Sequence, residues 1–113
     1  MTIIEERTGQ VLTVVLKGRL DAVTSKNVED QILKRIEEGQ RKLVLDLEHL
    51  DYISSVGLRV LLLTTKRLKG GDGRVVLCSP QPSIRQVFDI AGFLTLFLIF
   101  ETRAEAVQQL QGA

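Results

Sequence analysis

Apolar residues follow two different periodicities along this chain, and their alternation limits the folds that are open to it. Two runs with strand character come first, joined at residues 8–10 by a connection short enough for a β-hairpin. From there on, segments with the spacing of amphipathic helices alternate with short apolar segments that are typical of buried strands. This order predicts an α/β domain with an N-terminal β-hairpin and a mixed, mostly parallel sheet connected by crossover helices.

The predicted elements follow the order β-β-α-β-α-β-α-β-α. Strands are expected at residues 3–7, 11–17, 42–47, 74–78 and 96–100. Helices are expected between a cap at Asp21, Thr24 or Ser25 and a stop at Gly39, over residues 56–69, after Pro82, and after the capping-box residue Thr102. The 113 residues fit one such domain, so we expect a single domain over residues 1–113.

Composition and charge exclude several classes of partner. Lys and Arg number 15 and Asp and Glu 14, and this balance favours neither nucleic acid nor an anionic membrane. The apolar run at residues 93–100 is far shorter than the roughly 20 residues of a membrane span, and the acidic N-terminus does not resemble a signal peptide. Cys78 is the only cysteine, which fits a reducing compartment. We therefore expect a cytoplasmic protein.

Two adjacent serines stand where a strand pattern gives way to a helix pattern, in the sequence DYISSVG at residues 51–57. Ser55 is the expected helix N-cap, because a serine hydroxyl there accepts a hydrogen bond from a backbone N–H. Capping alone is one interpretation. The other is a covalent switch, since a helix N-terminus tolerates the roughly −1.5 to −2 charges of a phosphate. Gly57, which lacks a side chain, is expected to leave the first turn open to another protein.

The assumed topology gathers distant segments at one edge of the sheet. If the strands ending near residues 17, 47 and 78 are parallel, their carboxyl ends lie together, and functional groups in α/β sheets collect there. Residues 18–21, 51–57 and 79–80 are then expected to converge. Asp21 and the serine pair are predicted to be neighbours.

Three stretches carry a resemblance to a known family. The sequence LVLDLEHLDYISSVGLRVLL at residues 43–62 resembles the signature of the anti-sigma-factor antagonists, the bacterial STAS domains. The similarity continues over residues 70–93 and is supported by LKGRLDAVTS at residues 16–25. It spans nearly the whole chain. The resemblance implies that Ser55 is the phosphoacceptor and that Asp21 lies beside it.

A partner-switching module is the function that this resemblance implies. Unphosphorylated, such a protein binds a serine kinase that also acts as an anti-sigma factor; phosphorylation releases it, and a separate PP2C-type phosphatase resets the switch. No cofactor is expected. The family often has Asp directly before the acceptor, where this chain has Ser54, which makes Ser54 a competing acceptor. The implied partner-binding residues are Asp21, Ser54, Ser55, Val56, Gly57 and Arg59.

A hydrolase is the obvious enzymatic alternative, and the sequence argues against it. A nucleophile elbow needs G-x-S-x-G, but Ile53 stands where the first glycine would be. His49, the only histidine, is expected in a solvated loop with no spacing that brings it to Ser55. One Cys and one His cannot build a zinc site. We therefore expect no catalytic residues and no metal.

Two further questions stay open at this point. The domain could be a non-switching scaffold or a small-ligand sensor in which the serines only cap a helix. Phe93 and Leu94 are expected either in the core or exposed on a docking surface. Arg19, Arg59 and Arg85 are candidates for the charged rim of such a surface, with plain solvation as the default.

Overall fold

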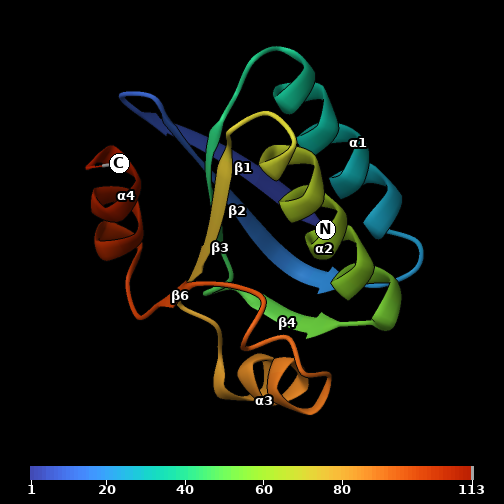
Figure 1. Ribbon diagram of the computed structural model, residues 1–113. Coiled ribbons are helices and arrows are strands. Elements are labelled where there is room, and N and C mark those ends of the chain that lie inside the picture. The colour runs from blue at the N-terminus through green and yellow to red at the C-terminus, as the bar shows by residue number, and fades with distance from the viewer. Residues whose placement is uncertain (113) are drawn as a thin grey trace.

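The computed structural model describes residues 1–112, which form an α/β domain (Figure 1). The strands are β1 (Thr2–Thr8), β2 (Val11–Leu20), β3 (Lys42–Asp46), β4 (Leu50–Ile53), β5 (Arg74–Cys78) and β6 (Ile99–Phe100). The helices are α1 (Ser25–Glu37), α2 (Ser55–Lys69), α3 (Pro82–Ile90) and α4 (Arg103–Gln111). The predicted fold class is confirmed, and one strand, β4, was not predicted.

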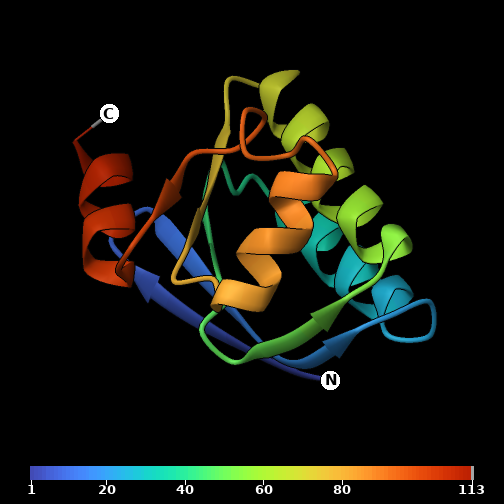
Figure 2. The same ribbon diagram turned by 90° about the horizontal axis from the view of Figure 1, so that it is seen from below.

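The sheet has the order β1-β2-β3-β5-β6. β1 and β2 form the antiparallel hairpin, whereas β2, β3, β5 and β6 run parallel. The additional strand β4 pairs in parallel with the last part of β2, beyond a register shift between Gly18 and Arg19. β2 therefore continues past β3 and carries β4 at its carboxyl end (Figure 2).

Helices cover both faces of the sheet. α4 lies alone on one face, where Ala106 and Leu110 pack with buried residues of β2, β3 and β5 (Figure 1). α1, α2 and α3 lie on the other face over the larger core cluster, which includes Val28, Leu61 and Phe88. The double burial explains why β2 and β3 are apolar on both faces, as is usual for strands of a covered parallel sheet.

The apolar run at residues 93–100 turns sharply instead of forming one strand. Phe97 is buried, and its ring lies near those of Phe88 and Phe93, at centroid distances of 6.2 and 5.9 Å. Phe93 and Leu94 are half-buried against the core. The expected strand at 96–100 is shortened to Ile99–Phe100, because the chain turns to place Phe97 inward.

Candidate functional site

Pairing between β2 and β4 brings the start of α2 to the loop that precedes α1. Arg19 is paired with Tyr52 and Leu20 with Ile53, so Asp21 and Ser54 follow directly after paired residues. The backbone N–H of Ser54 donates to the carbonyl of Leu20 at 2.9 Å. The predicted proximity of residues 18–21 and 51–57 is thus present in the structure (Figure 2).

Ser54, not Ser55, is the N-cap of α2. Its backbone is extended, and its Oγ accepts a hydrogen bond from the N–H of Gly57 at 3.1 Å. Ser55 is the first helical residue and is exposed. The prediction was wrong by one residue because a capping hydroxyl serves the N–H three positions ahead, and for Ser55 that group, on Leu58, donates to the Ser54 carbonyl instead.

Gly57 faces the core rather than an open first turn. A Cβ at this position would lie 2.9 Å from three atoms, namely Cγ1 of Ile53 and both Cγ and the carbonyl oxygen of Leu20. Such separations are too short for real side chains. The expectation that Gly57 opens the turn to a partner was therefore wrong, since the missing side chain lets α2 approach the ends of β2 and β4.

Asp21 orders the loop between β2 and α1. Its Oδ1 accepts hydrogen bonds from the backbone N–H groups of Val23 and Thr24, each at 3.0 Å, and its own N–H donates to Oγ1 of Thr24. The hydrogen bond from the Thr24 backbone lowers the pKa of Asp21. Within residues 1–112, no hydrogen bond joins Asp21 to Ser54 or Ser55. Asp21 thus follows directly after the paired Leu20, while its carboxylate bonds within its own loop.

Exposed side chains of mixed character lie on the segments that adjoin Ser55. Arg59 is exposed and lies one helical turn after Ser55, on the same face of α2. The guanidinium of Arg19 lies 4.2 Å from the ring centroid of Tyr52, a cation–π contact at the surface. Val23, in the adjoining loop, is 82% exposed. Val56 is half-buried, so it contributes less to this surface.

The third segment that was expected at this edge has other neighbours. Ser79 donates through its backbone N–H to Phe100 and through its Oγ to Glu101, at 2.9 and 3.1 Å. β3 stands between β5 and β2 in the sheet. Residues 79–80 therefore lie at the carboxyl edge of the sheet but next to β6, and the following Gln81 donates to the Glu48 carbonyl at 2.9 Å.

His49 and Cys78, the side chains considered for catalysis or metal binding, have other neighbours than the serines. The ring of His49 is half exposed and lies 3.9 Å from Glu48, with no bond to Ser55. In the described part of the chain, no cluster of His, Cys, Asp and Glu could hold a metal ion. Cys78 is buried, and this burial, with the nearby charge of Asp46, raises the pKa of its thiol to about 12.

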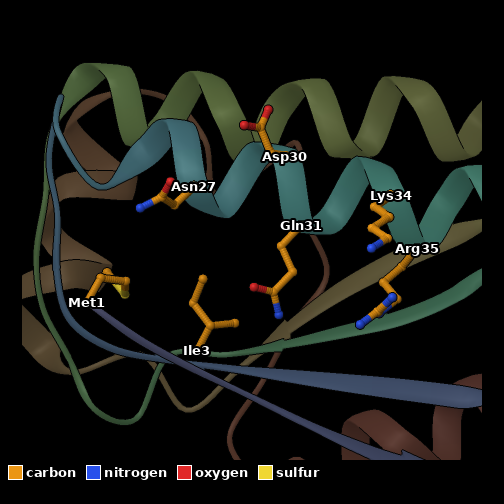
Figure 3. A pocket seen from close by; sticks show the side chains of 7 residues that line it. All are labelled: Met1, Ile3, Asn27, Asp30, Gln31, Lys34 and Arg35. Atoms are coloured by element: carbon orange, nitrogen blue, oxygen red, sulfur yellow. The ribbon is translucent and has the colours of Figure 1, made fainter.

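A hollow of about 630 Å³ lies between β1 and α1, lined by none of the predicted partner-binding residues (Figure 3). Gln31 and Arg35 point from α1 toward β1, and Ile3 points back from β1 (Figure 3). Both polar side chains donate to the carboxylate of Glu5. The polar groups of Glu5, Gln31 and Arg35 in this region thus bond one another.

The geometry defines a small binding domain that presents an exposed serine at the start of a helix. The model of the STAS domain family matches residues 2–106, and the chain belongs to this family, as the resemblance implied. Among the helices of residues 1–112, none is long and apolar enough to cross a membrane.

Similar proteins carry names from sigma-factor regulation. BtrV of Bordetella bronchiseptica is 39% identical over 91% of this chain and 89% of its own length. An anti-sigma F factor antagonist of Paenibacillus polymyxa is 30% identical over 89% of this chain and 87% of its own. The solved structure of the unphosphorylated anti-sigma factor antagonist SpoIIAA has the same fold, with a TM-score of 0.87, 24% identity and coverage of 99% and 98% of the two chains.

Proposed function

We propose that this protein is an anti-sigma-factor antagonist of a partner-switching pathway. In its unphosphorylated form it binds a serine kinase that acts as an anti-sigma factor, and phosphorylation of Ser55 releases it. The proposal rests on the exposed position of Ser55 at the first residue of α2. Two relatives named above are antagonists of this kind by name, which supports the same role here.

Ser55 is a better acceptor than Ser54 because of the hydrogen bond that occupies Ser54. The Ser54 hydroxyl is half-buried and caps the helix, so a kinase would have to break that contact to reach it. Ser55 is exposed and outside the cap. The argument for Ser55 is therefore accessibility, not capping as the sequence suggested.

The surroundings of Ser55 can accept a phosphate without loss of the fold. The first turn of α2 contains no acidic residue, and its N-terminal amide dipoles favour negative charge. The added charge, roughly −1.5 to −2, would face a partner surface that was fitted to a neutral hydroxyl. Phosphorylation then acts on docking while the domain stays folded.

The chemistry of the switch requires two other proteins. The kinase transfers the γ-phosphoryl group of ATP to Oγ of Ser55, takes up the hydroxyl proton and releases ADP. A PP2C-type phosphatase hydrolyses the phosphoserine and restores the binding form. The kinase step uses ATP, which supports a cytoplasmic location, and neither step requires a catalytic residue of this chain.

Intact-mass measurement tests the proposal. The protein is incubated with ATP, magnesium and an extract of its source cells, and a gain of one phosphate is expected. The gain should disappear in Ser55→Ala and persist in Ser54→Ala. Ser83→Ala is a matched control, because Ser83 is also an exposed serine in the first turn of a helix.

Capture of the kinase completes the test. Unmodified protein should retain it, and Ser55→Asp should lose it because the added charge spoils the contact. If no phosphate is gained and Ser55→Asp captures the same partners as the unmodified protein, the domain is a non-switching scaffold and the proposal is wrong.

A further inference from the structure

The strand β6 covers only part of the edge of β5. The pairs are Leu77 with Ile99 and Cys78 with Phe100, so Arg74–Val76 has no partner on that side among residues 1–112. The N–H groups of Leu77 and Ser79 donate toward this side. Because backbone donors alternate along a strand, the N–H of Val75 points the same way. The beginning of β5 therefore presents an open sheet edge.

A hollow of about 240 Å³ lies against this edge. Its walls are Thr65 and Lys69 of α2, residues 73–75, and Leu96 and Leu98. The two leucines are 50% and 52% exposed and both line the hollow, so they form an apolar wall that solvent can reach. They would cover the apolar side chains of a chain segment laid along β5.

Two cations, Lys69 and Arg74, line the same hollow, and two more lie near it in the sequence. Lys66, Arg67 and Lys69 occupy the last turn of α2, and Arg74 begins β5. Within residues 1–112, none of the four forms an ion pair, and Asp72 is the single carboxylate between positions 66 and 76. Cations suit a helix C-terminus, but Arg74 lies in a strand, so the helix dipole does not account for the whole group.

We propose that this edge binds an extended acidic segment of a partner protein by strand addition. The backbone of the segment pairs with the N–H and C=O of Val75, its apolar side chains lie on Leu96 and Leu98, and its carboxylates meet Lys69 and Arg74. Strand addition supplies main-chain hydrogen bonds, and the flanking side chains supply selectivity. The surface differs from that of Ser55, so the two can be tested separately.

A synthetic peptide of about ten residues that alternates Glu with Leu is a suitable probe. In NMR titration at low salt, the amide signals of Val75, Leu96 and Leu98 should shift, while those around Ser55 stay unchanged. A peptide that alternates Lys with Leu should not bind. Lack of binding by the Glu peptide, or shifts centred on Ser55, would overturn the proposal.

Charge reversal separates a specific site from general attraction. The double variant Lys69→Glu, Arg74→Glu should weaken binding of the Glu peptide about tenfold. The matched control Lys17→Glu, Lys34→Glu changes the net charge equally near the β1–β2 end of the sheet and should leave binding unchanged. Equal weakening by both double variants would overturn the proposal.

Removal of the backbone donor tests strand addition itself. Val75→Pro takes away the N–H on the open side, where proline is tolerated in a sheet, and should weaken peptide binding while circular dichroism shows an intact fold. If Val75→Pro unfolds the domain, the test uses hydrogen exchange of the Val75 amide in the wild type. Peptide binding should slow this exchange, and an unchanged exchange rate contradicts strand addition. Concentration-dependent dimerisation in sedimentation that Val75→Pro abolishes would instead identify a second copy of this chain as the occupant and overturn the proposal.

Discussion

The backbone N–H of Ser54 is hydrogen-bonded to the carbonyl of Leu20 at 2.9 Å. Leu20 ends β2 and Ser54 caps α2, so this bond fixes the first turn of α2 against the loop that begins with Asp21. The buried ends of β2 and β4 therefore determine the position of the Ser55 hydroxyl. Because this support does not involve the hydroxyl itself, Ser55 can be modified without loss of the fold.

Ser54→Ala should destabilise the protein by about 1 kcal/mol, because the N–H of Gly57 loses its side-chain acceptor. Ser55→Ala is the matched control and should change the free energy of unfolding by less than about 0.5 kcal/mol, as is usual for exposed sites. Urea unfolding measures both. A larger loss in Ser55→Ala than in Ser54→Ala would contradict the assigned cap.

Gly57→Ala should destabilise the protein by about 1–3 kcal/mol, as overpacking does in a tight core. The new Cβ would come within 2.9 Å of Leu20 and Ile53, and one of the close atoms is the Leu20 backbone oxygen, which cannot rotate away. Gly70→Ala is the control, because its Cβ would meet nothing nearer than 3.6 Å and its backbone is helical. Gly70→Ala should be neutral or stabilise by up to about 1 kcal/mol. Equal stability of the two variants in urea would refute close packing at Gly57.

Glu5 should make folding stability depend on acid pH. The hydrogen bond from Arg35 lowers the pKa of Glu5 below its ordinary value of 4.5, although burial opposes part of this effect. A lowered pKa means that the ionised form stabilises the fold above pH 4.5 and that this contribution is lost as the pH falls through the lower folded-state pKa. The difference in free energy of unfolding between the wild type and Glu5→Gln should therefore become smaller in acid. When Arg35→Gln is already present, Glu5→Gln should likewise have a smaller effect on the free energy of unfolding. A difference that grows below pH 4.5 would contradict this assignment.

Local periodicity was sufficient to predict most of the fold but not β4. This strand has only four residues, and its central pair, Asp51 and Tyr52, is exposed. Its partner is the end of β2, so nothing within the segment itself distinguishes it from a loop. Long amphipathic helices such as α1 carry their signal locally and were predicted correctly.

The candidate site was predicted in position but not in detail. The order of strands and helices brings Asp21 and the serines to one edge. Which of two adjacent serines caps α2, and whether Gly57 faces solvent or core, depends on the rotation of the helix against β2 and β4. That rotation is set by tertiary packing, so either assignment fits the sequence.

An ion pair between Arg103 and the buried carboxylate of Asp46 also had no local signal, since 57 positions separate the two residues. Nε and a terminal nitrogen of Arg103 each lie 2.8 Å from Oδ2 of Asp46, whose side chain is only 2% exposed. Arg103 begins α4 and also donates to Glu6. The pair therefore attaches the start of α4 to the carboxyl end of β3.

Arg103→Met should cost about 3–5 kcal/mol, because it leaves the buried carboxylate of Asp46 without its cation. The control is Arg85→Met, which breaks a 3.5 Å pair with Glu101 whose side chains are 41% and 85% exposed, and it should cost less than about 1 kcal/mol. Cys78 reports detachment of α4, because it packs with Ala106 and Leu110 of that helix and becomes accessible only when the helix detaches. A thiol reagent should thus label native Arg103→Met faster than the wild type or Arg85→Met. Equal urea midpoints and equal labelling rates for the two variants would mean that Arg103 does not hold α4 in place.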